Sequence, residues 1–425
     1  MSKIAKFKEL SFLVYGLGLS GRSVINFFKK KKIEQFYVWD DNKKSSFKRY
    51  RPKNLRQSLH KVDYIILAPG VSLIKNKQLK KFQKKIITDI DLFYLFNKNF
   101  KSIVVTGTNG KSTTCKLIAH LLRKSKLKYT IGGNIGTPIL DIKISKNIYV
   151  IIEASSFQLS HSQFIKPDYA FFLNLTNDHL DWHGNMNHYL NSKLKIFNLQ
   201  QKSHFAIINL KLKKIFFKRK FLGKPIFPKI KNYEKIKDKI KNDYLISKIN
   251  NENMSFVYEF AKILKIKEKS FINIMGSFKG LTHRFEIFLK KKGVIFINDS
   301  KATSFAAMQP ALQSLDNIYL ILGGLPKKND KINLSRFNKK IKKCYLIGKR
   351  TNFFKKQISQ QVDFITTKNI KNSIIQIFKD ISLDKKQNKV ILLSPAAASF
   401  DQFQNFEKRG DEFKRLCMIY GRKFI

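Results

Sequence analysis

A glycine-rich segment that ends in Gly-Lys-Ser carries the strongest chemical signal in the sequence. It runs from Thr106 to Thr113 as T-G-T-N-G-K-S-T, after a predicted strand at 103–106 and before a predicted helix. In a phosphate loop, backbone N–H groups bind phosphate oxygens, the lysine offers its charge to the β- and γ-phosphates, and the following hydroxyl can bind Mg²⁺. Val105 stands where the generic pattern has its first glycine. The segment predicts an ATP-binding domain, with contacts from Gly107, Thr108, Asn109, Gly110, Lys111, Ser112 and Thr113.

Polar side chains also follow two further predicted strands. Glu153 ends the strand in I-Y-V-I-I-E, and Asn174, Asp178, His179 and Asp181 follow the strand in Y-A-F-F-L. Singly, such a histidine is more often a capping or core residue, and such a glutamate is more often a surface residue. Because parallel strands end at one sheet edge, these groups should lie beside the phosphate loop. This shared position favours a site for Mg²⁺ that bridges ATP and an acceptor.

A second glycine-rich segment, G-L-G-L-S-G at 16–21, lies near the N-terminus between a predicted strand and a predicted helix. Asp40 and Asp41 end the next predicted strand. This pattern is typical of nucleotide binding, with phosphate at the helix N-terminus and ribose hydroxyls at the acidic residue. From this motif alone, a dinucleotide, another nucleotide and a merely structural tight turn all remain open.

Strands that alternate with helical stretches position these residues throughout the chain. The pattern indicates α/β domains with mainly parallel sheets, and 425 residues are more than one core usually organises. We expect domain boundaries near residues 92 and 281, giving domains at 1–92, 93–280 and 281–425. The Lys-rich stretch at 211–248 has the weakest periodicity and is expected to be a surface excursion of the middle domain.

The composition is that of a folded globular protein with an unusual charge. The chain has 84 lysine and arginine residues against 29 aspartate and glutamate residues, a formal net charge of +55. The lysines are spread over nearly every segment, which favours a solvated surface over a nucleic-acid face. Three separated cysteines indicate neither a disulfide framework nor a zinc site. With no signal peptide or membrane span recognisable, we expect a cytoplasmic protein with no nucleic-acid partner and no membrane insertion.

Eight segments in one order, spanning nearly the whole chain, resemble the Mur ligase family, and the last block is most specific to its D-glutamate-adding members. They are T-G-T-N-G-K-S-T (106–113), G-G-N-I-G (132–136), E-A-S-S-F-Q-L (153–159), N-D-H-L-D (177–181), S-K-L-K-I-F (192–197), L-T-H-R-F-E (281–286), N-D-S-K-A-T (298–303) and S-P-A-A-A-S-F-D-Q-F-x-x-F-E-x-R-G (394–410).

The resemblance implies a reaction and an architecture. In this family, ATP phosphorylates a carboxylate of the UDP-linked substrate and an amino acid attacks the resulting acyl phosphate. It implies ATP, Mg²⁺, UDP-N-acetylmuramoyl-L-alanine and D-glutamate as ligands of a monomeric enzyme of peptidoglycan precursor synthesis. It also implies a Rossmann-like N-terminal domain, a central phosphate-loop ATPase domain and a Rossmann-like C-terminal domain.

The resemblance further assigns roles to single residues. Lys193 matches a lysine that the family carbamylates, so that it joins Ser112, Glu153 and His179 as a metal ligand. Lys195 lies two positions later in the same motif and could be mistaken for it. Lys111, Glu153, His179 and Lys193 are the implied catalytic residues. Further ATP contacts are Asn134, His283 and Arg284. The N-terminal motif becomes a UDP site rather than a dinucleotide site, with Gly18, Leu19, Ser20, Asp40 and Asp41.

The implied D-glutamate pocket combines cations, hydroxyl groups and aromatic rings: Lys301, Thr303, Lys327, Ser399, Phe400 and Phe406. Such donors suit the two carboxylates of the acceptor. The chain departs from the family at Ser160, at Ser304 and at Leu325-Pro326, where the family commonly has Glu, Asn and Asp-Gly. The alternatives are a relative that adds another amino acid, a folylpolyglutamate-type ligase, or a nucleic-acid-stimulated ATPase that would explain the charge.

Overall fold

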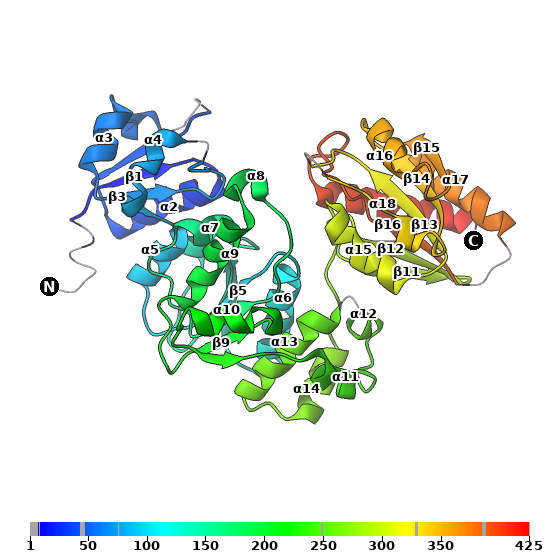
Figure 1. Cartoon of the computed structure of the whole chain (residues 1–425), viewed down its shortest axis with the longest axis horizontal. Helices are drawn as coiled ribbons and strands as arrows, with labels where there is room; N and C mark the ends of the chain where they lie inside the picture. The colour runs from blue at the N-terminus through cyan, green and yellow to red at the C-terminus, as the bar shows by residue number, and fades with distance from the viewer. Residues whose placement is uncertain are drawn as a thin grey trace. The chain divides into compact units, whose positions relative to one another are not determined.

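The computed structural model describes residues 7, 9–42, 47–74, 76–247, 250–327, 330–384 and 388–424. Within these ranges the chain forms three mainly parallel sheets with helices, so the predicted α/β class is confirmed (Figure 1). By contacts it divides into two compact units, 1–236 with 252–275 and 237–251 with 276–425. None of the described helices is both long and apolar enough to cross a membrane.

The N-terminal sheet has four parallel strands in the order β2-β1-β3-β4. The elements are β1 (Phe12–Tyr15), α2 (Leu19–Lys31), β2 (Phe36–Trp39), α3 (Leu55–Lys61), β3 (Tyr64–Leu67), α4 (Lys77–Lys80), β4 (Ile86–Ile87) and α5 (Asp89–Phe96). At Gly21, a Cβ would lie 2.0 Å from the carbonyl oxygen of Gly16, so the close approach of α2 to the first loop requires glycine.

The central sheet has six parallel strands in the order β10-β9-β8-β5-β7-β6. Its strands are β5 (Lys101–Thr106), β6 (Tyr129–Gly133), β7 (Tyr149–Glu153), β8 (Tyr169–Phe172), β9 (Phe205–Ile208) and β10 (Lys224–Ile226). Its helices are α6 (Lys111–Lys124), α7 (Ser156–His161), α8 (Leu180–His183), α9 (Met186–Leu194), α10 (Lys213–Lys218), α11 (Ile230–Lys237), α13 (Asn251–Ile263) and α14 (Glu268–Gly276). The apolar runs of β5, β7 and β8 are buried, as expected for strands covered on both faces.

The N-terminal and central sheets share one packing unit. Helix α5 begins with a capping box between Thr88 and Asp91, and a boundary at residue 92 would divide this helix. Its residues Ile90 and Phe93 pack in the central core, while Leu92 packs in the N-terminal core. Ser23 of α2 also donates to Asp141 at 2.8 Å. The division at 92 stays a prediction.

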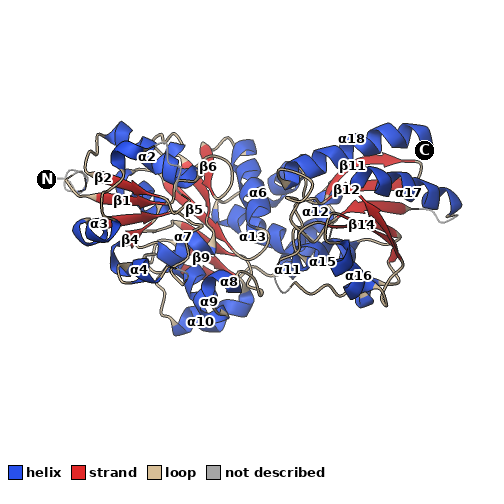
Figure 2. Cartoon of the chain, turned by 90° about the horizontal axis from the view of Figure 1, so that it is seen from above, coloured by secondary structure: helices blue, strands red, loops and turns tan. Residues whose placement is uncertain are grey.

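The C-terminal sheet has six strands in the order β11-β12-β16-β13-β14-β15, of which only β11 runs antiparallel. Its elements are β11 (Glu286–Lys291), β12 (Val294–Asn298), α15 (Phe305–Ser314), β13 (Ile318–Gly323), β14 (Ile341–Ile347), α16 (Thr351–Ile358), β15 (Phe364–Lys368), α17 (Ile370–Leu383), β16 (Lys389–Leu393) and α18 (Phe406–Phe424). Helices α15 and α16 pack on one face and α17 and α18 on the other, as Figure 2 shows.

The Lys-rich stretch at 211–248 differs from the expected surface excursion. Its strand β10 extends the central sheet beside β9. Residues 237–251, including α12 (Asp243–Ile246), group instead with the C-terminal sheet. Tyr244 packs against that sheet's core, and the Asn242 amide donates to the carbonyl oxygens of Gly276 and Phe278. Tertiary packing therefore divides a segment that looks uniform in sequence.

Candidate active site

The phosphate-loop segment joins the end of β5 to the start of α6, as its sequence predicts. Gly110 caps the helix in a left-handed conformation with φ of 81°, and a Cβ there would lie 2.2 Å from the side-chain oxygen of Asn253. Glycine is therefore required at position 110, because another residue would be strained at this φ and its Cβ would clash with Asn253. Ser112 and Thr113 are buried in the first turn of the helix.

The side chain of Lys111 folds back over the loop. Its Nζ donates to the carbonyl oxygen of Gly107 at 2.8 Å and to that of Thr108 at 2.9 Å. Thr108 is fixed in turn, because its hydroxyl accepts from the Thr176 backbone and lies 3.0 Å from the Tyr189 hydroxyl. These two hydrogen bonds restrict the rotamers of Lys111 and keep its ammonium group beside the loop.

Lys193 reaches the same loop from helix α9. Its side chain is 1% exposed, its Nζ donates to the Gly107 carbonyl oxygen at 2.8 Å, and the Nζ lies 4.6 Å from the centre of the Tyr189 ring. Burial, and secondly the charge of Lys111, hold the pKa of Lys193 well below its ordinary value. The nitrogen is thus driven toward its neutral form.

Lys195, two residues later, lies in different surroundings. Its Nζ donates to the Ser160 carbonyl oxygen at 2.6 Å, at the C-terminal end of α7. The structure therefore separates two lysines that sequence alone distinguishes only by resemblance, and it brings Lys193 rather than Lys195 to the phosphate loop.

Glu153 lies at the carboxyl end of β7, which pairs directly with β5. It is buried, and its Oε1 accepts from the Asn134 side chain at 2.9 Å. Its Oε2 is also buried and has no hydrogen-bond partner among the described residues. An unpartnered carboxylate oxygen is costly unless a cation, a donor or water satisfies it.

His179 caps α8 with a positive φ of 55°. Its ring lies 4.7 Å from that of Phe157 and 6.3 Å from that of Tyr189, between centroids, and its Nε2 lies 3.4 Å from an Asp178 oxygen. Tyr189 also contacts Lys193 and Thr108, so His179 belongs to the same neighbourhood. The described residues contain no group of three or more His, Cys, Asp or Glu side chains placed to bind a metal. Of the four predicted metal ligands, only Glu153 and His179 belong to these residue types.

Three polar residues that support the loop were not predicted from sequence as site residues. The Asn174 side chain accepts from the Asn109 backbone at 2.9 Å and donates to Glu252 at 2.7 Å, and Asn209 donates to the other Glu252 oxygen. Its sequence position indicates only that Asn174 follows a strand. Glu252 and Asn209 carry no local sequence signal.

In the N-terminal sheet, the predicted UDP residues gather around the first loop. Asp40 accepts from the backbone N–H of Leu17 at 2.7 Å, and Asp41 accepts from the Tyr15 hydroxyl at 2.8 Å. Burial raises the pKa of the Asp89 carboxyl, and the Ser20 side chain interacts with this carboxyl and lowers its pKa by less, whereas Gly18 and Leu19 are exposed, the latter by 82%. Asp40 therefore fixes the loop, Asp41 binds side chains of β1 and β2, and the Gly18-Leu19 tip of the loop is exposed.

In the second unit, His283 and Arg284 precede β11. His283 is buried, its backbone N–H donates to Glu286, and its Nδ1 lies 3.0 Å from the Asn298 amide nitrogen. Burial lowers the pKa of His283. Arg284 is half-buried.

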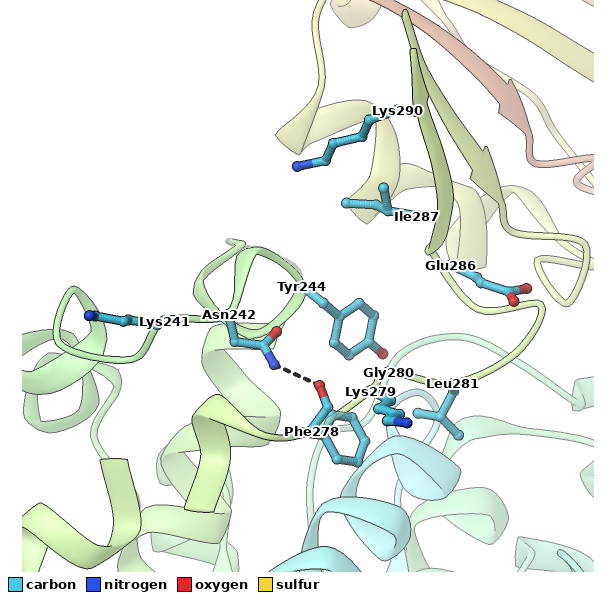
Figure 3. Close-up of a pocket in the computed structure, with 10 residues that line it drawn as sticks. All are labelled: Lys241, Asn242, Tyr244, Phe278, Lys279, Gly280, Leu281, Glu286, Ile287 and Lys290. Atoms are coloured by element: carbon cyan, nitrogen blue, oxygen red, sulfur yellow. Dashed lines mark hydrogen bonds between the residues drawn. The ribbon is translucent and has the colours of Figure 1, made fainter. Parts of the chain in front are cut away.

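A cavity of about 400 Å³ lies next to the segment of His283 and Arg284. It is lined by Tyr244, Phe278, Leu281, Glu286, Ile287 and neighbouring residues (Figure 3). None of the predicted site residues lines it.

The predicted amino-acid pocket is partly assembled. Lys301 Nζ lies 4.6 Å from the centre of the Phe406 ring. Ser399 is buried, Thr303 is half-buried, and Lys327 and Phe400 are exposed, the latter by 71%. Paired backbone hydrogen bonds of 2.9 Å between Leu325 and Ala398 bring the segments of Lys327 and Ser399 side by side.

The sequence of this chain is similar to those of several known proteins. Residues 105–280 match the model of the Mur ligase middle domain. The chain is 35% identical to the UDP-N-acetylmuramoylalanine--D-glutamate ligase of Rickettsia prowazekii, over 96% of this chain and 98% of that protein. It is 33% identical to the ligase of the same name from Wolbachia pipientis wMel, over 97% of each chain.

Solved structures share the fold at low identity. The MurF ligase of Thermotoga maritima in complex with ADP aligns with a TM-score of 0.57 at 16% identity, over 97% of each chain. The UDP-N-acetylmuramate-alanine ligase MurC of the same organism aligns with a TM-score of 0.54 at 14% identity, over 97% of this chain and all of that one. These likenesses support the fold and, with it, the three α/β domains.

Proposed function

The chain belongs to the Mur ligase family, and from this premise we propose that it joins D-glutamate to UDP-N-acetylmuramoyl-L-alanine with ATP, in peptidoglycan precursor synthesis. Relatives that match over nearly their whole length carry the name of this ligase. The observation that carries the proposal in the structure is the convergence of Lys111 and Lys193 on the phosphate loop, beside the end of the strand that bears Glu153.

The reaction proceeds in two balanced steps. A carboxylate oxygen of the alanyl group attacks the γ-phosphorus of ATP, the bond from that phosphorus to the bridging oxygen breaks, and ADP leaves. The amino group of D-glutamate then attacks the carbonyl carbon of the acyl phosphate. The carbon–oxygen bond breaks, inorganic phosphate leaves and the amine loses a proton. Activation turns a poor electrophile into a good one and splits one difficult step into two.

Lys111 stabilises the phosphoryl group during the first step. Its Nζ is held over the carbonyl oxygens of the loop, next to the backbone N–H groups that would bind the phosphates. Charge that is already oriented toward the transferring group costs no reorganisation when the transition state forms. The remaining ATP contacts come from the loop residues, Asn134, His283 and Arg284.

Mg²⁺ would be held by Ser112, Glu153, His179 and Lys193, the last as a carbamate. The unpartnered Oε2 of Glu153 fits this assignment, because a buried carboxylate oxygen is a suitable ligand for a hard cation. When bound, the ion neutralises charge on the phosphate oxygens. Carbamylation requires an unprotonated amine, and the lowered pKa of Lys193 supports that requirement.

The other two substrates use the remaining residues of the site. Gly18, Leu19, Ser20, Asp40 and Asp41 form the UDP site, in which the exposed Leu19 can cover the uracil ring. Lys301, Thr303, Lys327, Ser399, Phe400 and Phe406 form the D-glutamate pocket. We propose that the enzyme acts as a monomer in the cytoplasm.

An isotope experiment tests the acyl phosphate. UDP-N-acetylmuramoyl-L-alanine labelled with ¹⁸O in its carboxylate is incubated with ATP, Mg²⁺ and D-glutamate, and the released phosphate is analysed by mass spectrometry. One ¹⁸O atom per phosphate is expected, because the oxygen that attacks phosphorus leaves with it. Phosphate without label would contradict carboxylate activation.

A further inference from the structure

Arg409, in helix α18, is a fully buried cation that forms no ion pair with the residues that the structure describes. Its side chain is 1% exposed. Its Nε donates to the Ser300 hydroxyl at 3.0 Å and its Nη2 to the Ser300 carbonyl oxygen at 2.7 Å. Its Nη1 is buried and has no hydrogen-bond partner in the described part of the chain. Both hydrogen-bonded partners are neutral, although removing a charge from water is costly unless an opposite charge offsets it.

The acidic side chain that acts on Arg409 electrostatically is Asp401. Among the described residues the guanidinium hydrogen-bonds only Ser300, and the Oδ2 of Asp401 accepts from the backbone N–H of Lys349 at 2.9 Å. Burial lowers the pKa of Arg409 to about 10, so the side chain is still charged at neutral pH.

The guanidinium lies among the segments that carry the predicted D-glutamate residues. Ser300, which precedes Lys301, also donates its hydroxyl proton to the carbonyl oxygen of Phe406 at 2.8 Å. Arg409 thus holds Ser300 against the segment on which Phe406 lies, and Lys301 Nζ stands over the Phe406 ring.

The Nη1 atom lies close to Gly324, and Gly324 in turn lies close to Ala398. A Cβ added at Gly324 would lie 3.3 Å from Nη1 and 2.3 Å from the carbonyl oxygen of Ala398. Gly324 lies three residues before Lys327, and Ala398 directly precedes Ser399. Arg409 therefore binds the segment of Lys301 and lies next to Gly324, which in turn adjoins the segment of Ser399.

We propose that Arg409 is a positioning residue for the acceptor: it fixes the segments of Lys301, Phe406, Lys327 and Ser399 and supplies a fixed positive charge that favours a dicarboxylate. The inference rests on the proposed function. A charge in a poorly solvated region acts over longer distances than one in water, so the guanidinium need not touch the ligand to favour its carboxylates. An anionic acceptor in turn offsets the burial of the cation.

A kinetic comparison of Arg409→Met with Arg409→Lys tests this role. Arg409→Met should raise the KM for D-glutamate by about tenfold or more, because a buried charge is lost next to an anionic ligand. The KM for the UDP substrate should stay within about twofold, since its predicted residues lie at 18–41, and the KM for ATP should change less than that for D-glutamate, since most of the proposed ATP contacts are in the phosphate loop. Arg409→Lys keeps the charge but not the paired hydrogen bonds, and it should lie between Arg409→Met and the wild type. Arg415→Met, on the exposed side of the same helix, is the matched control and should change none of the three values.

Two results would overturn the proposal. One is an unchanged KM for D-glutamate in Arg409→Met. The other is an equal loss for all three substrates, which would indicate a purely structural residue. If Arg409→Met does not fold, Ser300→Ala decides the question. It removes only the hydroxyl that links Arg409 to Phe406, and the KM for D-glutamate should rise by about threefold or more. No rise there would equally reject the role.

The failure of this inference is distinguishable from that of the proposed function. Wild-type enzyme that does not use D-glutamate would reject the function itself. Wild-type enzyme that uses D-glutamate, together with an Arg409→Met variant of unchanged KM, would reject only the role of Arg409.

Discussion

Lys111 and Lys193 donate hydrogen bonds to the same carbonyl oxygen, that of Gly107, each at 2.8 Å. Two ammonium groups that converge on one oxygen repel each other, and Lys193 is the more deeply buried of the two. Protonation of Lys193 is therefore disfavoured by its burial and by its neighbour. The relationship is consistent with the proposed roles, in which Lys111 serves as a cation for phosphate and Lys193 reacts with CO₂ as a neutral amine.

Replacing Lys193 tests this division of roles. Lys193→Ala should lose most of its activity and regain part of it when formate or acetate is added at high concentration, because a small carboxylate can supply the missing carbamate oxygens. The measurement is ligation rate against carboxylate concentration. Lys195→Ala is the control: it loses contacts to α7 and should show no such rescue. Equal rescue of both variants, or of neither, would argue against a carbamate at position 193.

Replacing Lys111 tests the phosphate-loop assignment. Lys111→Ala should fold and lose at least about 2 to 3 kcal/mol of transition-state stabilisation, a loss in kcat of roughly thirtyfold to more than a hundredfold. Lys124→Ala, at the exposed end of the same helix, should keep wild-type rates. Retention of more than about a tenth of the activity by Lys111→Ala would contradict its role.

Glu153→Gln addresses the metal. The change keeps the shape of the side chain but removes its charge, so we expect a large loss of kcat and a higher Mg²⁺ concentration for half-maximal activity. Glu259→Gln, a half-buried carboxylate on α13, serves as the control. An unchanged Mg²⁺ requirement in Glu153→Gln would remove this residue from the metal site.

The stability of the protein should depend on pH through Asp299. This carboxyl is buried, accepts from the Ser394 hydroxyl and the Phe285 backbone, and has its pKa raised by burial to about 7. Between about pH 4 and 7 the folded protein holds a proton that the unfolded chain has released, so the contribution of Asp299 to stability falls as pH rises through this window. The melting temperature of Asp299→Asn relative to wild type should therefore rise from pH 4 to 7 and level off above it. A difference that is constant with pH would show that Asp299 does not titrate in this range.

The parts of this fold that follow from local sequence were predictable. Apolar runs such as those of β5 and β7 predict buried strands, and Gly-Lys-Ser after a strand predicts the loop that leads into α6. The supporting contacts were not predictable. Glu252 reaches Asn174 across 78 positions of sequence, and Asn253 lies against Gly110 only because α13 packs there. Such pairs depend on tertiary packing, which no local pattern records.

The burial and the tertiary partners of single residues in the site were likewise not predictable from local sequence. Lys193 and Lys195 are alike in sequence, and only their burial and partners separate them. Arg409 looks like one more charged residue of an amphipathic helix. Its burial is decided by the Ser300 segment, which lies 109 positions earlier in the chain.

The acceptor preference tests the central claim most directly. Phosphate release from ATP is measured with UDP-N-acetylmuramoyl-L-alanine and each of D-glutamate, D-glutamine, D-alanine and L-glutamate. We expect kcat/KM for D-glutamate to exceed those for D-glutamine and D-alanine by roughly tenfold to a hundredfold or more, since each loses a charge-assisted contact of about 1.5 to 3 kcal/mol. L-Glutamate should fail because its amine points away from the acyl phosphate once both carboxylates are held. Comparable use of D-alanine, or preference for any L-amino acid, would contradict the assignment.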